Sequence, residues 1–312
     1  MIGLRFDAFF QYTGNPMSDP LQRLDQFLAH AEKLLSQLEP LLPPPPSEIN
    51  WKAPAYRWRK RNGRGYLQAV PKPHPIRLRD LKDIDEQKRR VEANTRQFLA
   101  GQPANNVLLT GARGCGKSSL VKALLNEYAK KGLRLIEVDK SDLVDLADIV
   151  DLVAARPEHY IVFCDDLSFE ANEAAYKALK SVLDGSVTSV PDNVIIYATS
   201  NRRHLLPEYY AENLEGAKVG EEIHPGEAVE EKVSLSERFG LWLSFYPFSQ
   251  DDYLRVANHW LKSFGCDAAT IADAEREALN WALSRGSRSG RVAWQFARDY
   301  AGALALGKEG KR

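Results

Sequence analysis

Cysteine is scarce in this sequence, and its spacing fits neither a disulfide framework nor a structural zinc site. The three cysteines, Cys115, Cys164 and Cys266, are far apart, and no C-x-x-C pair occurs. Disulfide-stapled domains are rich in cysteine, and structural zinc sites typically use C-x-x-C pairs. We therefore expect free thiols and a reducing compartment, which we take to be the cytoplasm.

Long apolar runs and an excess of charge of one sign are also missing. No apolar stretch reaches the roughly 18 residues of a membrane-spanning helix, and no basic flank precedes a hydrophobic stretch at the N-terminus. Lys plus Arg number 42 and Asp plus Glu number 42, so the formal net charge is zero. These absences argue against a membrane protein and against a chain that binds nucleic acid through overall positive charge.

The overall amino-acid composition is that of an ordinary globular protein. Of the 312 residues, 44% are hydrophobic and 27% are charged, and the length suits roughly two domains. Short β-rich runs alternate with helical stretches, which predicts an α/β fold with a parallel sheet covered by helices. The expected strands are 106–111, 133–138, 160–165, 193–199 and 241–246, and the expected helices include 117–131 and 170–183.

The region before this core has two helical patterns. Apolar residues near 3.6-residue spacing predict an amphipathic helix over 21–39, which stops before the consecutive prolines Pro43–Pro46. A second helix is expected over about 80–100, with Asp80 as its N-cap and Gly101 just past its end.

The region after the core is helical throughout. Beyond Gln250 no strand pattern occurs, and the acidic stretch 212–232 ahead of it predicts an exposed insertion. We therefore expect an N-terminal helical and basic-aromatic extension over 1–77, a nucleotide-binding αβα core over 78–248, and a small all-α C-terminal lid over 249–312.

The segment 51–66 combines cations with aromatic side chains and contains no acid. Its members are Trp51, Lys52, Tyr56, Arg57, Trp58, Arg59, Lys60, Arg61, Arg64 and Tyr66. Such a segment neutralises phosphates and stacks bases in proteins that bind nucleic acid. Alternatively, the aromatic residues pack onto the sheet and the cations face solvent or acidic groups. The zero net charge favours this second interpretation, a protein or self contact.

The strongest motif is a phosphate-binding loop between an expected strand and an expected helix. It consists of Gly111, Ala112, Arg113, Gly114, Cys115, Gly116, Lys117 and Ser118, followed by Ser119. Glycines in this G-x-x-x-x-G-K-[ST] pattern let backbone N–H groups surround a phosphate at a helix N-terminus. Lys117 supplies a charge for the β- and γ-phosphates, and the Ser118 hydroxyl is a Mg²⁺ ligand. We expect Cys115 to be a small buried residue, and the alternative is that it makes the loop sensitive to oxidation.

A second motif is an apolar strand that ends in two acids, Asp165 and Asp166. Beside a phosphate loop, Asp165 is placed to hold the Mg²⁺ shell, and Asp166 is placed to orient or deprotonate water.

Together with downstream residues, these motifs resemble the AAA+ ATPase superfamily over roughly residues 78 to 305. The resemblance implies that Asn201, at the end of YATSN, is the sensor-1 residue that contacts the γ-phosphate. Ser236-Glu-Arg238-Phe-Gly looks like the arginine-finger motif of bacterial replication initiators and helicase loaders. By this likeness, Arg238 reaches a neighbouring subunit's γ-phosphate in a ring or spiral. A surface charge or an ion pair at the core edge is the alternative for Arg238.

Two further sites follow from the same resemblance. The stretch Gly-Ser-Arg288-Ser-Gly-Arg291 is similar to the sensor-2 region, with Arg291 as first choice and Arg288 as the alternative. The stretch 80–87 is similar to the superfamily's entry to the adenine pocket, which places Ile84 near the base.

A more specific likeness is to a bacterial AAA+ family known only as a domain of unknown function. It rests on FCDDLSFE at 163–170, YATSNRRHLLPE at 197–208 and SLSERFGLWLSF at 234–245. This resemblance implies an ATP-binding module and carries no known substrate.

The sequence departs from the superfamily pattern at one catalytic position. Most AAA+ proteins have Asp-Glu where this chain has Asp165-Asp166, and aspartate is one methylene shorter, which predicts slow hydrolysis. Glu170 could take the place of Asp166 in activating water only if the turn LSFE, residues 167–170, folds back toward the phosphate loop. Guanine recognition is disfavoured, because no N-K-x-D stretch occurs.

Two functions are therefore expected from the sequence, both with ATP and Mg²⁺. One is an ATPase that hydrolyses ATP in a homo-oligomer and remodels a protein or, less favoured, a nucleic acid. The other is a slowly hydrolysing switch or scaffold that assembles on a partner when nucleotide is bound.

Overall fold

The computed structural model describes residues 24–25, 27–33, 48–169, 173–184, 191–202, 218–219, 222–223 and 235–309. The chain divides into two units, Met1–Glu48 and Ile49–Arg312. In the first unit, residues 24–25 and 27–33 are helical, which agrees with the expected amphipathic helix over the part that is described. Pro43–Pro46 lie outside the described residues.

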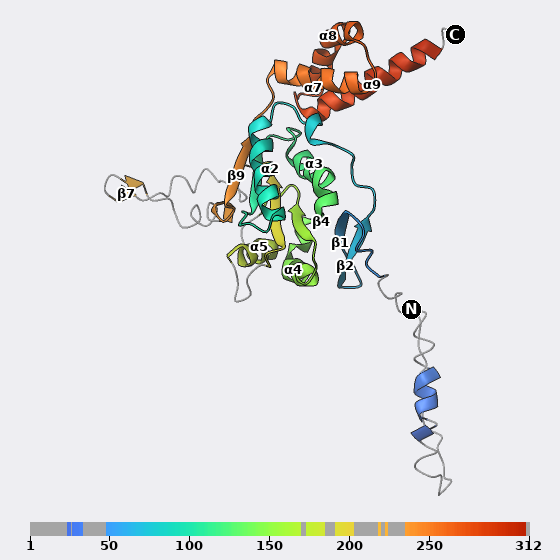
Figure 1. Ribbon diagram of the computed structural model, residues 1–312, viewed down its shortest axis with the longest axis vertical. Coiled ribbons are helices and arrows are strands. Elements are labelled where there is room, and N and C mark those ends of the chain that lie inside the picture. Colours follow the sequence, from blue (N-terminus) through green and yellow to red (C-terminus); the bar gives the residue numbers. More distant parts are fainter. Residues whose placement is uncertain are drawn as a thin grey trace, which may run out of the picture. The chain divides into compact units, whose positions relative to one another are not determined.

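A seven-stranded sheet organises the second unit (Figure 1). Its strand order is β2-β1-β4-β5-β6-β3-β9, and every neighbouring pair is parallel except β1 and β2. The strands are β1 Ala55–Arg61, β2 Arg64–Val70, β3 Val107–Gly111, β4 Leu133–Val138, β5 His159–Cys164, β6 Val194–Ser200 and β9 Leu241–Phe245. The five strands expected from the sequence are β3, β4, β5, β6 and β9, each displaced by one residue at most.

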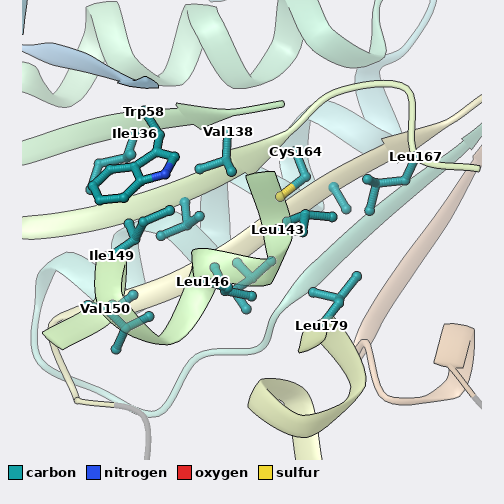
Figure 2. Close-up of a cluster of buried hydrophobic side chains, with 14 of the residues drawn as sticks. Trp58, Ile136, Val138, Leu143, Leu146, Ile149, Val150, Cys164, Leu167 and Leu179 are labelled. Atoms are coloured by element: carbon teal, nitrogen blue, oxygen red, sulfur yellow. The ribbon is translucent and has the colours of Figure 1, made fainter. Parts of the chain in front are cut away.

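Helices cover both faces of this sheet, because alternate residues of each strand point to opposite sides. On β5, Tyr160 and Val162 belong to the buried cluster that also contains residues of α4 and α5, and Figure 2 shows part of this cluster. Ile161 and Phe163 belong to the cluster on the other face, with residues of α2 and α3. The helices are α2 Asp85–Leu99, α3 Lys117–Tyr128, α4 Leu146–Ala154 and α5 Ala174–Asp184. The expected three-layer αβα fold is therefore confirmed.

The second helix begins later than expected. Asp80 is not its N-cap but the last residue of a separate 3-10 turn, Leu78–Asp80, where its carboxylate accepts the Arg77 N–H at 2.9 Å. Asp83 then has a left-handed φ of 59°, which breaks the chain direction before α2 starts. Ile84 takes the N-cap position, whereas Gly101 lies just past the C-cap as expected.

The other helices match the expected ones with shorter bounds. α3 ends at Tyr128 and continues as a 3-10 turn over Ala129–Lys131. α5 begins at Ala174, and residues 170–172 are outside the described part. α4, between β4 and β5, was not among the helices named from the sequence, because nine residues make few helical turns and show little of the 3.6-residue apolar periodicity.

The basic-aromatic segment forms a hairpin that extends the sheet. From the sequence, this segment was expected to belong to an N-terminal extension outside the core. β1 pairs with β2 through a tight Asn62-Gly63 turn, and both turn residues have positive φ, as type I′ turns require. β1 also pairs in parallel with β4, so that Ala55 lies opposite Leu135. Gly65 is needed on β2, because a Cβ there would lie 1.8 Å from the Trp58 ring.

Most side chains of this hairpin have partners within the chain. Tyr56 and Trp58 are buried in the core, and the Trp58 indole N–H donates to Asp145 at 2.9 Å. On the opposite face, the Arg57 guanidinium pairs with Glu137 at 2.7 Å. Lys60 and Arg59 form ion pairs with Asp145 and Asp139 at 2.8 and 3.1 Å. Of the two interpretations, these contacts favour packing on the sheet and acid binding within the chain.

Replacing Trp58 by alanine is expected to lower the free energy of unfolding by about 3–5 kcal/mol, because a buried indole is lost and its cavity remains. Urea unfolding followed by circular dichroism measures the change. Arg61→Ala, at the exposed end of the same strand, is the control and is expected to change stability by at most about 0.5 kcal/mol. A change of less than about 1 kcal/mol for Trp58→Ala would mean that the hairpin does not fold with the sheet.

The C-terminal part packs as three helices around its own core. α7 Gln250–Ser263, α8 Ala268–Ser284 and α9 Gly290–Glu309 bury a cluster that includes Tyr253, Leu261 and Phe296. The expected all-α C-terminal part is therefore present, and its role as a lid stays a prediction. Within the acidic stretch 212–232, β7 Lys218–Val219 pairs with β8 Glu222–Ile223, and the rest lies outside the described residues.

Candidate functional site: a phosphate loop at the carboxyl end of the sheet

The phosphate loop connects the buried strand β3 to the N-terminus of α3. Gly111 has a φ of 121° and lies against β9, where a Cβ would come within 1.9 Å of the Phe245 carbonyl oxygen. Gly116, with a φ of 99°, is the N-cap residue of α3. Because of these two glycines the loop turns tightly over the helix end, where free N–H groups and the helix dipole favour an anion.

Lys117 lies beneath the loop and is almost completely buried. Its ammonium donates to the carbonyls of Gly111 and Ala112 at 2.7 Å each, and to Asn201 Oδ1 at 3.0 Å. Burial lowers the pKa of this ammonium below its ordinary value, and the nearby Cys115, Asp166 and Asp165 oppose that shift. The charge of Lys117 is thus held at the loop by oxygen atoms on several sides.

Asp165 follows β5 and meets the first turn of α3. Its Oδ1 accepts the Ser118 hydroxyl at 2.5 Å and the Thr199 hydroxyl at 2.6 Å. A hydroxyl and a carboxylate are oxygen ligands of the kind that Mg²⁺ takes, and Mg²⁺ sites commonly use one or two protein groups together with phosphates. Ser118 and Asp165 therefore fit a Mg²⁺ ion. Across the described residues, His, Cys, Asp and Glu form no metal-type cluster of three or more.

Asp166 has an unusual backbone conformation. Its φ of 55° is left-handed, which is uncommon for a residue other than glycine. The Asp166 N–H donates to Thr199 Oγ1 at 2.9 Å, and the Asp166 carboxylate accepts the Asn201 side-chain amide at 2.5 Å. Lys117, Asn201 and Asp166 are thereby joined in one line of hydrogen bonds.

These side chains line a cavity of about 590 Å³. It lies where ligands bind in parallel sheets, at the carboxyl ends of the strands. The lining comes from the loop and α3, the ends of β5 and β6, the segment before α2, and the lid. Its members include His74, Ile76, Asp80, Leu81, Ile84, Arg113, Gly114, Cys115, Gly116, Lys117, Ser118, Ser119, Asp165, Asp166, Thr199, Asn201, Trp260, Arg291 and Trp294.

Several residues named from the sequence thus come together, and others do not. Ile84 is buried beside the loop, and a Cβ on Gly116 would lie 3.3 Å from its Cδ1; its expected position near the adenine base stays a prediction. Cys115 is buried, and burial raises the pKa of its thiol. Both Arg291 and Arg288 are exposed, but only Arg291, at the start of α9, lines the cavity. Glu170 lies outside the described residues.

Arg238 lies at the other end of the sheet from the phosphate loop. It precedes β9, whose first residue Leu241 is in register with Val107 at the start of β3, while the loop follows the end of β3. A five-residue strand at about 3.3 Å per residue separates the two ends by roughly 13 Å. The Arg238 side chain forms an ion pair with Asp184 at the end of α5. The alternative of an ion pair is therefore realised within the subunit.

Several lining residues were not singled out in the sequence, among them Thr199, Trp260 and Trp294. Thr199 is a polar residue near the end of a mainly apolar strand, two positions before Asn201, and this was the available signal. Trp260 and Trp294 reach the cavity from α7 and α9. No sequence signal pointed to them, because a lid residue meets the loop only through the packing of distant segments.

Comparison with protein families decides the affiliation of the chain. Residues 51–304 match the model of a family described as "Protein of unknown function (DUF815)". The chain belongs to this family. Its phosphate loop, paired acids and helix-covered parallel sheet are those of an AAA+ P-loop ATPase, as the motif resemblance implied.

Curated relatives of this family member match only locally. The replication factor C large subunit of Staphylothermus marinus is 37% identical over 81 residues, 26% of this chain and 18% of that protein. The ATP-dependent zinc metalloprotease FtsH of Aquifex aeolicus is 27% identical over 182 residues, 49% of this chain and 27% of that protein. The chain therefore spans about a quarter or less of the length of these two relatives.

Solved structures give weaker similarities. A mutant of Thermotoga maritima RuvB has a TM-score of 0.49 at 14% identity, over 75% of this chain and 68% of that chain. The T. maritima RuvB Holliday junction branch migration motor has a TM-score of 0.45 at 15% identity, over 75% and 67%. Similarities at this level carry no functional argument.

Among the described residues, no helix has the length and apolar character to cross a membrane.

Proposed function

We propose that this protein binds ATP with Mg²⁺ and hydrolyses it within a homo-oligomer in order to remodel a macromolecular partner. One observation carries the proposal. The ammonium of Lys117, the amide of Asn201 and the carboxylate of Asp166 form a line of hydrogen bonds in one cavity, over a glycine-lined helix N-terminus. The Thr199 hydroxyl connects this line to the carboxylate of Asp165. A phosphate-binding cation, an oxygen pair for Mg²⁺ and a carboxylate base for water are thus adjacent.

Each group has a role in this proposal. Lys117 and the backbone N–H groups of the loop bind the β- and γ-phosphates, and Ser118 and Asp165 hold Mg²⁺. Bound Mg²⁺ neutralises charge on the phosphate oxygens. Asp166 accepts the proton of the attacking water, which Asn201 helps to orient. The adenine ring of ATP lies against Ile84, and Arg291 approaches the phosphates from the C-terminal helices.

Arg238 is proposed to act on the nucleotide of a neighbouring subunit. Its distance from the loop of its own subunit supports this assignment, because the whole length of β3 separates them. A heterologous interface that brings Arg238 to the next subunit's loop generates a ring or a spiral.

A protein partner is favoured over a nucleic acid. Stacking on bases needs exposed aromatic faces, yet Tyr56 and Trp58 are buried in the core. Phosphate binding needs available cations, yet Arg57, Arg59 and Lys60 pair with acids of the chain.

A second candidate function is a slowly hydrolysing switch that assembles on a partner when ATP is bound. The observation that favours it is the environment of Asp166. Its carboxylate is one methylene shorter than glutamate and already accepts the Asn201 amide at 2.5 Å. A base held in this way has less freedom to reach water.

Turnover measured against protein concentration separates the two functions. We expect turnover per subunit to rise with concentration, because the site is completed at an interface.

Asp166→Asn is expected to reduce turnover by about a hundredfold or more while leaving ATP binding intact, because general-base catalysis contributes about 10²–10⁴ in rate. Asp192→Asn, an exposed aspartate in the turn before β6, is the control. Negligible turnover of the wild type with tight ATP binding would contradict the motor and support the switch.

A further inference from the structure

The cavity contains one buried residue that contacts both acids and has no assigned role. Thr199, on β6, is only 1% exposed. β6 pairs with β5 up to the register Cys164 opposite Ala198, so Thr199 is the first residue past the paired region. It therefore lies beside Asp165, at the point where β5 gives way to the two acids.

Thr199 makes three hydrogen bonds to three consecutive residues. Its hydroxyl donates to Asp165 Oδ1 at 2.6 Å and accepts the Asp166 N–H at 2.9 Å. Its backbone carbonyl accepts the Leu167 N–H at 2.7 Å. The hydroxyl has one proton and accepts through its lone pairs, so this pattern uses it in both roles at once.

These bonds orient the two acids in different ways. Asp165 Oδ1 also accepts the hydroxyl of Ser118, the other proposed Mg²⁺ ligand, at 2.5 Å. The hydrogen bond from Thr199 therefore fixes the orientation of the Asp165 carboxylate beside Ser118. For Asp166, the bond is to the backbone. It holds the residue in its left-handed conformation, with φ of 55°, from which the carboxylate meets Asn201. A residue other than glycine keeps this sparsely populated conformation only where the surrounding contacts hold it, and this bond is one of them.

We propose that Thr199 is the positioning residue of this site. Through one hydroxyl it orients Asp165 as a Mg²⁺ ligand and fixes the backbone from which Asp166 faces the attacking water. This inference rests on the proposed function and deepens it. Groups that hydrogen-bond to metal ligands typically contribute 10- to 100-fold to metal affinity or activity.

Three variants of the full chain test the proposal. Thr199→Val keeps the shape of the side chain but removes the hydroxyl, whereas Thr199→Ser keeps the hydroxyl. Ser200→Ala is the matched control, because Ser200 is also buried, and its hydroxyl donates to the Leu167 carbonyl at 2.6 Å without touching either acid. Thr199→Ala serves in place of the valine variant if circular dichroism shows that the latter does not fold.

The readouts separate metal binding from nucleotide binding and from turnover. AMP-PNP affinity is measured by calorimetry in EDTA, and Mn²⁺ affinity of the AMP-PNP complex by electron paramagnetic resonance. Thr199→Val is expected to bind AMP-PNP in EDTA like the wild type, but to lose about 10- to 100-fold in Mn²⁺ affinity and about as much in ATP turnover. Thr199→Ser and Ser200→Ala are expected to stay within about threefold of the wild type in all three.

Wild-type Mn²⁺ affinity in Thr199→Val would overturn the proposal, as would an equal loss in Thr199→Ser or in Ser200→Ala. Failure of the proposed hydrolysis has a different signature. In that case the wild type binds AMP-PNP and Mn²⁺ without turning over ATP, and the comparison of Mn²⁺ affinities still decides the role of Thr199.

Discussion

Replacing Lys117 by alanine is expected to weaken ATP binding by about a hundredfold or more and to abolish measurable turnover. The ammonium is almost completely buried at the loop, where no other described lysine donates to the carbonyls of Gly111 and Ala112. Hydrogen bonds to charged groups contribute about 1.5–3 kcal/mol each, and about 1.4 kcal/mol corresponds to a factor of ten. Calorimetry with AMP-PNP measures the affinity, and phosphate release measures turnover.

The control for this variant is Lys130→Ala. Lys130 is exposed, just past the opposite end of α3, so its removal leaves the loop unchanged. Thermal unfolding of both variants shows whether Lys117→Ala remains folded, because Lys117 also bonds to the loop itself. If folded Lys117→Ala bound AMP-PNP as tightly as the wild type, the phosphate loop would not be the nucleotide site.

Replacing Arg238 by alanine is expected to reduce turnover by about a thousandfold, while ATP binding to the isolated subunit stays unchanged. Arginine fingers contribute about 10³–10⁵ in rate. Binding is preserved because Arg238 lies at the opposite end of β3 from the loop of its own subunit. Arg96→Ala, an exposed arginine in the last turn of α2, is the control.

Mixing the two inactive variants tests whether Arg238 acts between subunits. A Lys117→Ala subunit contributes an intact Arg238, and an Arg238→Ala subunit contributes an intact loop. In a randomly mixed ring, about a quarter of the interfaces therefore contain both groups. We expect the equimolar mixture to recover turnover that neither variant has alone. No recovery, despite mixed oligomers seen by sedimentation, would mean that Arg238 does not act across the interface.

The sequence allowed the phosphate loop and the paired acids to be identified before the fold was known. Both motifs are contiguous, so the residues that define them are neighbours along the chain. The core strands were predictable for a similar reason. Strands buried on both faces are continuous apolar runs, and each run is bounded by its own local signals.

The hairpin β1–β2 was missed although part of its signal was present. Asn62-Gly63 is a strong sign of a tight hairpin turn, but the run of cations around it resembles a solvated or phosphate-binding segment. What decides its structure is distant in the chain. Glu137, Asp139 and Asp145 supply the negative charges, and β4 supplies the free edge for β1.

The start of α2 shows how tertiary structure overrides local capping preference. Asp80 has the right residue type for an N-cap, yet its carboxylate is used in the 3-10 turn and also lies 3.3 Å from His259 of α7. The helix begins after Asp83, whose carboxylate pairs with Arg255 of the same lid helix at 2.8 Å. These partners are more than 170 residues away in sequence.

By itself, the sequence determined the chemical groups of this site and the strands that carry them, because motif spacing and apolar runs are local properties. Only the tertiary structure decided which groups meet. It brought Thr199 against both acids, placed Arg291 and not Arg288 at the cavity, and set Arg238 at the end of the sheet away from its own loop. Such contacts depend on strand order and register, which arise from the packing of segments far apart in the chain.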